Sequence, residues 1–199
     1  KSVFREYGMP QAIRTDNGSP FASSQALAGL SRLSVWWLKL GIRLERIRPG
    51  NPQENGRHER MHRTLKQETA LPARSSLKAQ QAAFNLFRAE YNNERPHEAL
   101  CMKCPAQVYK ISAREFPETL SQVEYSTNIE PYKVSDEGNI RYGVNRIFLS
   151  SSLRNENVGI EEIDERHRRL YFASAVLGII DAYTGKLLQY KNPMEISGE

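Results

Sequence analysis

The spacing of apolar residues changes near residue 128, and this change limits the possible folds more than any other feature of the sequence. Before that point, apolar residues recur every three or four positions, as at Leu27, Leu30 and Leu33, which is the spacing of an amphipathic helix. After it, short apolar-rich segments alternate with turn signals such as Asp136–Asn139, which is typical of a small β-barrel or sandwich. The sequence therefore predicts an α/β part followed by a small all-β barrel.

The boundaries of the expected elements follow from Gly, Pro and other turn residues between the apolar segments. In the first part we expect helices over 3–7, 23–40, 55–68 and 77–91, strands over 12–15 and 42–47, and a loop over 49–52. In the last part we expect strands over 139–144, 146–149, 158–163, 170–173, 177–181 and 187–190. Residues 1–110 are assigned to the α/β part, 111–127 to a linker and 128–192 to the barrel.

Charge is distributed unevenly along the 199 residues. Residues 1–110 contain 18 Lys and Arg against 9 Asp and Glu, whereas residues 111–199 contain 10 against 14. Because basic surfaces bind phosphate backbones by releasing counterions, the first half is a candidate for nucleic-acid binding. Only two cysteines occur, so no disulfide framework is expected, and no apolar run is long enough for a membrane span. These features favour a cytoplasmic protein, associated with the nucleoid if it binds DNA.

The first candidate for chemistry is Asp16, which lies between an expected strand and the turn residues Asn17 and Gly18. A carboxylate just past the end of a strand is well placed to hold a hard cation at the rim of a sheet. The alternative is an ordinary Asp-Asn-Gly turn with no chemistry, and such turns are common. From this segment alone, the turn is the better interpretation.

The second candidate is the stretch over residues 51–66, which reads NPQENGRHERMHRTLK. On a helix, Glu59, Arg63 and Lys66 lie at positions i, i+4 and i+7 and share one face. A carboxylate among cations suits a metal ion held beside a phosphate backbone. The alternative is an exposed helix with an i,i+4 pair between Glu59 and Arg63, which contributes about 0.2–0.5 kcal/mol.

The same stretch contains the pattern H-E-x-x-H between His58 and His62, which is the helix signature of zinc metalloproteases. The spacing places both imidazoles on one helical face. A protease of this kind also needs a third protein ligand and an apolar surrounding, whereas this helix carries several arginines that repel a cation. A zinc metalloprotease is therefore a remote alternative.

Three motifs together resemble the DDE family of insertion-sequence transposases and retroviral-type integrases. Residues 7–10 (YGMP) and 14–21 (RTDNGSPF) are similar to the segment of the family's second catalytic aspartate, and residues 51–66 to the helix of its catalytic glutamate. Residues 91–100 (YNNERPHEAL) and 105–106 (PA) resemble the segment that follows the catalytic core in the transposases. The motifs follow one another in the family's order over about 100 residues. The resemblance implies the C-terminal half of a ribonuclease H-like core with a helical extension.

The resemblance also implies roles for individual residues. It makes Asp16 and Glu59, rather than Glu54, the catalytic carboxylates and the ligands of Mg²⁺ or Mn²⁺, with weak or absent binding of the ion expected in this chain alone. The family would use them for metal-dependent cleavage and strand transfer of DNA during transposition and recombination. The positions that the resemblance brings close to DNA are Asn55, Arg57, Arg60, Arg63, Lys66, Arg95 and His97.

One departure from the family pattern concerns activity. The family's first aspartate lies well upstream of the second, yet residues 1–15 contain no Asp. We therefore expect the chain to be inactive alone, with a homo-oligomer or a partner supplying the rest of the core. The alternative is a non-catalytic DNA-binding or assembly fragment. The 42 residues between Asp16 and Glu59 exceed the family's usual spacing, and we expect the helix over 23–40 to accommodate the excess.

A further expectation concerns the two tryptophans, Trp36 and Trp37, which lie on the helix expected over 23–40. In a ribonuclease H-like core such a helix packs on a sheet that includes strands upstream of this chain. Without them it would expose a large apolar patch. We therefore expect residues 1–68 to need another chain segment, a partner or a rearranged fold.

Overall fold

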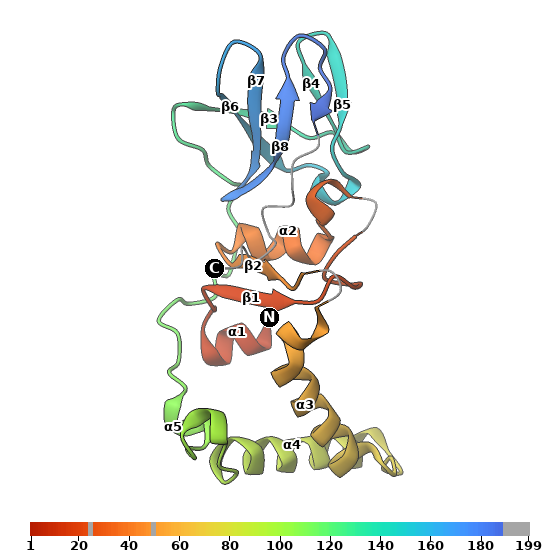
Figure 1. The fold of residues 1–199 in the computed structure, drawn as a ribbon, viewed down its shortest axis with the longest axis vertical. Coiled ribbons are helices and arrows are strands. Elements are labelled where there is room, and N and C mark those ends of the chain that lie inside the picture. Colours follow the sequence, from red (N-terminus) through yellow and green to blue (C-terminus); the bar gives the residue numbers. More distant parts are fainter. Residues whose placement is uncertain (24–25, 49–50, 189–199) are drawn as a thin grey trace.

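The computed structural model describes residues 1–23, 26–48 and 51–188, and Figure 1 shows how the elements are arranged. A β-rich part lies at one end, a short helix and a two-stranded sheet lie in the middle, and two helices lie at the other end. The α-helices are α1 (Ser2–Tyr7), α2 (Arg32–Lys39), α3 (Gly56–Leu65), α4 (Leu77–Asn93) and α5 (Pro105–Val108). The strands are β1 (Ala12–Thr15), β2 (Arg43–Arg46), β3 (Ile129–Lys133), β4 (Asn139–Tyr142), β5 (Asn145–Phe148), β6 (Asn157–Glu162), β7 (His167–Phe172), β8 (Ala175–Asp181) and β9 (Leu187–Leu188).

The central sheet consists of β1 and β2, which pair in parallel with Ala12 opposite Arg43 and Thr15 opposite Arg46. Both strands and the short helix before them lie where the sequence predicts. A parallel pair needs a crossover connection, and here residues 16–42 provide it, with α2 as its helix. Asp16 follows the last residue of β1 directly, so the topology places it at the carboxyl edge of this pair.

The helix predicted over 23–40 is wrong over residues 26–31, because α2 begins only at Arg32. Residues 24–25 of the predicted range lie outside the described residues. Ala28 and Gly29 have positive φ angles of 50° and 63°, which no α-helix accommodates. Ser31 then caps α2 by accepting a hydrogen bond from the Ser34 backbone N–H at 3.1 Å. The helical spacing of leucines misled the prediction, because Leu30 is fully buried from a 3-10 turn rather than from a helix. A loop, this turn and a short helix therefore span the distance between Asp16 and β2.

The helices α3 and α4 form an arm that points away from the central sheet (Figure 1). The predicted helices are both present, although α3 continues into one π-helical turn over Lys66–Ala70. The side chain of Gln80, on α4, donates to the Thr69 carbonyl at 2.9 Å and ties this turn to the second helix. The loop predicted over 49–52 falls partly on residues 49–50, which lie outside the described residues.

The β-rich part contains most of the predicted strands, but the predicted barrel is wrong. Strands β3, β6, β7, β8 and β9 form one antiparallel sheet in that order, while β4 and β5 form a separate hairpin. A barrel would require its two edge strands, β3 and β9, to pair with each other, and no such pairing exists within the described residues. The predicted strand over 187–190 and the predicted end at 192 extend beyond the described residues.

Strand β3 was not predicted, and its composition explains why. It reads IEPYK, with a proline and two charged residues in five positions, and proline ordinarily argues against a strand. Pro131 is tolerated because β3 lies at the edge of the sheet, where a strand needs hydrogen bonds on one side only.

The β-rich part covers the apolar face of α2, so one hydrophobic core joins both parts of the chain. Trp37 and Leu38 of α2 belong to the same buried cluster as Val158 and Leu170 of the five-stranded sheet. An ion pair of 2.9 Å between Lys39 and Glu156 crosses the same boundary. The large exposed patch expected around the tryptophans is absent from the described structure, because a segment of this chain supplies the cover.

The predicted linker over 111–127 has no regular secondary structure, but it is fixed to the α/β part at several points. The Arg114 guanidinium donates to the backbone carbonyls of Pro10, Leu40 and Gly41 at 2.6, 2.8 and 3.0 Å. Phe116 packs on the partly buried Trp36 with ring centroids 6.1 Å apart. This segment thus connects the two parts while packing against the first.

Among the described residues, no helix combines the length and the apolar character that crossing a membrane would require.

Candidate functional site

Asp16 occupies an exposed turn at the end of β1. One of its carboxylate oxygens, Oδ1, accepts the Gly18 backbone N–H at 3.0 Å, which closes the turn predicted from the Asp-Asn-Gly sequence. The neighbouring Asn17 side chain donates to the carbonyl of Ile47 at 2.8 Å, so this turn is held against the residue that follows β2. The turn uses only one carboxylate oxygen of this exposed residue, so the turn is compatible with a cation held by the other oxygen.

The structure separates the two glutamates near α3 by their surroundings. Glu54 accepts hydrogen bonds from the backbone N–H and the Nε of Arg48, both at 2.9 Å. Donation from the Arg48 backbone, reinforced by its guanidinium, lowers the pKa of the Glu54 carboxyl. Glu59 is exposed in the first half of α3 and has no hydrogen bond or ion pair within the described residues. Of the two, only Glu59 keeps its carboxylate free for a ligand.

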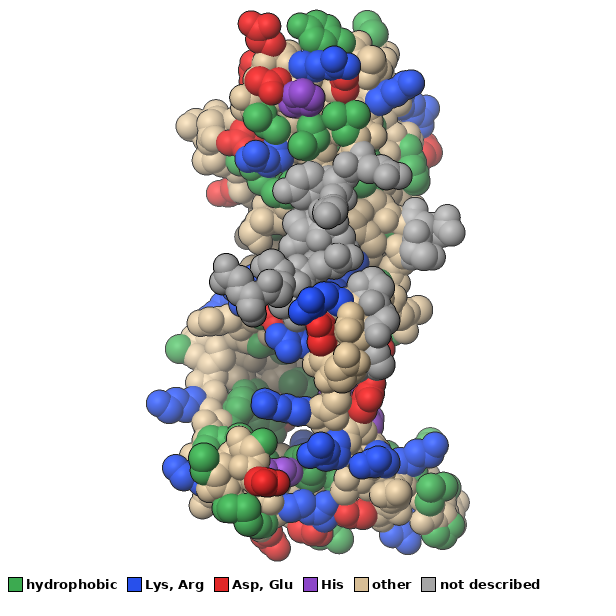
Figure 2. Space-filling model, viewed as in Figure 1, with side chains coloured by type: hydrophobic (Ala, Val, Ile, Leu, Met, Phe, Trp, Pro, Cys, Tyr) green, Lys and Arg blue, Asp and Glu red, His purple; other side chains and the backbone are tan. Residues whose placement is uncertain are grey.

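The cations of α3 are also free. Arg57, Arg60, Arg63 and Lys66 are exposed, and none of their side chains forms an ion pair with another described residue. The i,i+4 pair between Glu59 and Arg63, which was the structural alternative for this helix, is not formed. Figure 2 shows Lys and Arg side chains recurring over the α3 and α4 arm on the face in view. Asn55 precedes the helix, half-buried and without a side-chain capping bond.

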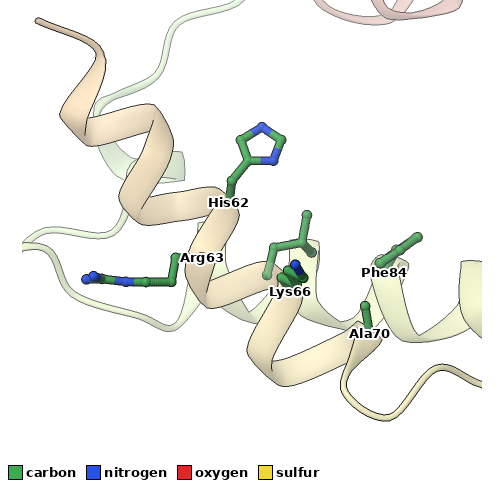
Figure 3. A pocket seen from close by; sticks show the side chains of 6 residues that line it. His62, Arg63, Lys66, Ala70 and Phe84 are labelled. Carbon is green, nitrogen blue, oxygen red and sulfur yellow. The ribbon is translucent and has the colours of Figure 1, made fainter. Parts of the chain in front are cut away.

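A shallow groove lies between the two helices of the arm and is shown in Figure 3. Leu65, Ala70 and Phe84 contribute apolar side chains to it, whereas His62, Arg63 and Lys66 contribute the polar ones. Arg63 and His62 point in different directions from consecutive positions of α3 (Figure 3). The groove therefore has an apolar interior with basic groups beside it.

Arg95 and His97, which were predicted to approach DNA, have structural contacts at the end of α4. The Arg95 guanidinium donates to both carboxylate oxygens of Glu68 at 2.9 and 3.0 Å and to Glu90 at 2.9 Å. His97 packs on Tyr91 with ring centroids 4.6 Å apart, and its buried Nε2 has no hydrogen-bond partner. These contacts fix the π-helical turn to α4 and give Arg95 a structural role in addition to the predicted one.

The two histidines of the H-E-x-x-H pattern do lie on one face of α3, with their Nε2 atoms 2.9 Å apart. No group of three or more His, Cys, Asp or Glu side chains in the described part of the chain is arranged to hold a metal ion. The third protein ligand that a zinc metalloprotease requires is thus not found among these residues.

Sequence reasoning missed the arginines that position the backbone around the site. Arg46 is buried and donates from its guanidinium to the carbonyls of Ala28 at 3.1 Å and Gly29 at 2.8 Å. A Cβ atom at Gly29 would collide with that guanidinium, so the turn requires glycine for space as well as for its positive φ. A charged residue in an alternating strand pattern is predicted to be exposed, and nothing in the single sequence indicates that Arg46 is buried.

Comparison with known protein families gives a match over residues 40–105 to the family described as integrase core domain. We call the matched residues 40–105 the integrase core segment. This segment runs from the end of α2 to the start of α5, so it includes Glu59, the second sequence motif and nearly all of the third. The resemblance stated from those motifs is confirmed, and Asp16 lies outside the matched residues.

Curated relatives of the integrase core segment include transposable-element and retroviral proteins. The chain is 30% identical over 101 residues to an uncharacterized 31.7 kDa protein of insertion element IS407 from Burkholderia multivorans, covering 50% of this chain and 34% of that protein. It is 30% identical over 112 residues to the transposase for insertion sequence element IS904 from Lactococcus lactis, covering 55% and 42%. A Pol polyprotein of radiation murine leukemia virus is 39% identical over 69 residues, covering 34% and 10%. The chain thus spans less than half the length of each of these relatives.

Among solved structures, the chain is similar to one in the simian T-cell lymphotropic virus intasome in complex with a PP2A regulatory subunit, B56 gamma. The TM-score is 0.41 and the sequence identity 18%, over 88% of this chain and 60% of that one.

Proposed function

We propose that this chain is part of a DNA transposase or integrase, in which Asp16 and Glu59 are two of the carboxylates that bind the divalent ions of phosphodiester cleavage and strand transfer. The observation that carries the proposal is the difference between the two glutamates near the start of α3. Glu59 has no internal partner, while the alternative carboxylate, Glu54, is bonded twice to Arg48. The match of residues 40–105 to the integrase core family supports the same assignment.

The donor chemistry fits the metal ions that such proteins generally use. Carboxylate oxygens are the ligands that Mg²⁺ and Mn²⁺ prefer, and Asp16 and Glu59 each expose one or both of theirs. When bound, two such ions would stabilise the attacking and leaving oxygens of the phosphodiester. These residues supply two carboxylates, so we propose that a third comes from outside residues 1–199 and that the chain alone is inactive.

The unpaired cations of α3 have a separate role in the proposal. Arg57, Arg60, Arg63 and Lys66 bind phosphates of the DNA and hold the backbone beside Glu59. Such contacts orient the substrate and neutralise charge rather than read base sequence. Asn55, Arg95 and His97 complete the proposed DNA-contacting set, with Arg95 released from part of its carboxylate contacts when DNA binds.

The test compares DNA binding with turnover. The 199-residue chain is expected to bind a labelled duplex with an affinity that falls steeply with salt, and to cleave nothing in Mg²⁺ or Mn²⁺. Joined to an upstream segment that supplies an aspartate-bearing strand, the chain is expected to cleave or join DNA. Glu59→Gln should abolish that activity while leaving DNA binding within about twofold, and Glu54→Gln should leave more than a tenth of it.

A competing function is that of a non-catalytic DNA-binding or assembly fragment. It is favoured by the basic, unpaired face of α3, which by itself explains DNA binding without turnover. Salt-sensitive binding combined with no activity in any joined form would select this function. Equal loss of activity in Glu54→Gln and Glu59→Gln would contradict the assignment of Glu59.

A further inference from the structure

We propose that His58 and His62 form a second metal site on α3, which binds a divalent transition-metal ion such as Ni²⁺ or Cu²⁺ and is chemically distinct from the proposed Mg²⁺ site. Both imidazoles are exposed, and they occupy positions i and i+4 of one helix. Their Nε2 atoms lie 2.9 Å apart and their ring centroids 4.3 Å apart. The two Nε2 atoms, through which histidines four residues apart on a helix can bind one ion, already face each other.

The distance between the two nitrogens is close to the separation that one shared ion requires. Imidazole nitrogens bind such ions at about 2.0–2.1 Å, so two of them around one ion are about 2.9–3.3 Å apart. The two Nε2 atoms lie 2.9 Å apart, so small rotations of the side chains would let both bind one ion.

The surroundings allow solvent to complete the coordination. Both His58 and His62 are exposed, so water has access to their rings. In the described structure the pair is joined by a hydrogen bond between the two Nε2 atoms, which requires one proton between them. A metal ion would replace that proton and bridge the same two atoms. The nearby arginines oppose any cation, but their charges are exposed and therefore screened by salt.

The histidine pair and the carboxylates Asp16 and Glu59 differ in the metal ions that their ligand atoms prefer. Imidazole suits Ni²⁺, Cu²⁺ and Zn²⁺, whereas carboxylates suit Mg²⁺ and Mn²⁺. The histidine pair therefore does not depend on the proposed catalytic function, and it needs no third protein ligand. An ion bound there would link two successive turns of α3, which would reduce local opening of the helix.

The test uses Ni²⁺ as the probe and the full 199-residue chain carrying Cys101→Ser and Cys104→Ser, so that thiols cannot bind the ion. Isothermal titration calorimetry is expected to give one Ni²⁺ per chain, undisturbed by a large excess of Mg²⁺. His58→Ala and His62→Ala are each expected to weaken binding at least tenfold. His167→Ala is the matched control, because His167 is paired with Asp164 in the β-rich part and should change the affinity less than twofold.

Hydrogen exchange provides a second readout that does not depend on the affinity of any variant. Ni²⁺ is expected to slow amide exchange several-fold within residues 56–65 and not elsewhere, and His62→Ala should remove the effect. Circular dichroism checks that each variant keeps its helix content. Equal Ni²⁺ affinity in the parent and both α3 variants would overturn the proposal, as would protection located outside α3 or equal weakening by His167→Ala.

Discussion

Single arginines hold irregular segments of the α/β part by donating to backbone carbonyls. The buried guanidinium of Arg46 donates to the carbonyls of Ala28 and Gly29, and burial lowers the pKa of Arg46. Arg114 does the same for the Pro10 carbonyl before β1 and for the carbonyls of Leu40 and Gly41 between α2 and β2. Because a guanidinium offers five N–H donors in a fixed plane, one side chain can replace a regular pattern of backbone bonds. These loops therefore keep their shape without secondary structure of their own.

Replacing Arg46 by Leu is expected to lower the free energy of unfolding by about 1–3 kcal/mol, because the half-buried carbonyl of Ala28 loses its side-chain donor and that of Gly29 loses one of its two donors. Urea unfolding followed by circular dichroism measures this change. The matched control is Arg43→Ala on the same strand, whose side chain is 69% exposed. It should cost no more than about 0.5 kcal/mol. A similar loss in both variants would contradict the structural role assigned to Arg46.

Individual elements were predicted best where burial follows the period of the element. Strand β2 lies within its predicted range, since apolar and charged residues alternate there, and β1 matches its predicted range before the Asp-Asn-Gly turn. The start of α2 was missed because the leucine spacing continues through the 3-10 turn. In that turn the spacing reflects the burial of side chains rather than helical structure. Strand β3 was missed because Pro131 is acceptable only at an edge, and the sequence does not say which strands are edges.

The end of β8 shows how one side chain defines a turn between elements. Asp181 accepts the backbone N–H groups of Tyr183 and Thr184 at 3.0 Å through Oδ1, and the Nε of Arg166 at 2.7 Å through Oδ2. Donation from the Thr184 backbone, together with Arg166, lowers the pKa of Asp181 to about 2. The carboxylate form therefore stabilises the turn that leads from β8 to β9.

The stability of the protein is expected to fall as the pH decreases from about 4 to about 2, partly through Asp181. Its folded pKa lies below the value of about 3.9 for an unfolded aspartate, so the stabilisation is complete above that value and is lost as the carboxylate becomes protonated. Asp181→Asn should reduce stability at pH 7 and weaken this pH dependence. Thermal unfolding across the pH range measures both effects. Glu165→Gln, which changes an exposed side chain in the neighbouring turn, should leave the pH profile unchanged.

At the scale of the whole molecule, the β-rich part and the α/β part share one hydrophobic core. The sequence predicted two separate bodies joined by a linker, because charge and periodicity both change between them. Neither the charge nor the periodicity indicates which surfaces of the two parts are in contact. Leu153 is fully buried in the short turn that contacts α2, and it belongs to the same cluster as Trp37. The two parts should therefore depend on each other for stability.

Leu153→Ala is expected to destabilise the chain by about 2–4 kcal/mol, because it leaves a cavity at the boundary between the two parts. Unfolding should remain a single transition in which tryptophan fluorescence and the far-ultraviolet signal change together. Val144→Ala, at a hairpin position that is 96% exposed, should have almost no effect. Two separate transitions, with the tryptophans changing in only one, would contradict a shared core.

The site was predicted residue by residue from motifs, yet its geometry could not be read from the sequence. The motifs selected Glu59 over Glu54, and the structure adds a physical reason, namely the two bonds from Arg48 to Glu54. The paired contacts of Arg95 with Glu68 and Glu90 were not foreseen, since those three residues come from separate elements. Long-range pairs of this kind leave no periodic signal in a single sequence.

The central claim is that Asp16 and Glu59 bind the same divalent ion, and paramagnetic Mn²⁺ titration followed by NMR tests it most directly. Because the chain supplies only two of the proposed carboxylates, Mn²⁺ is expected to bind weakly. At high concentration it should broaden the amide signals around Asp16 and around Glu59 over the same concentration range, and excess Mg²⁺ should restore both. Glu59→Gln should remove the broadening at both places, while His62→Ala should leave it unchanged. Broadening around only one of the two carboxylates, or broadening that persists in Glu59→Gln, would contradict the claim.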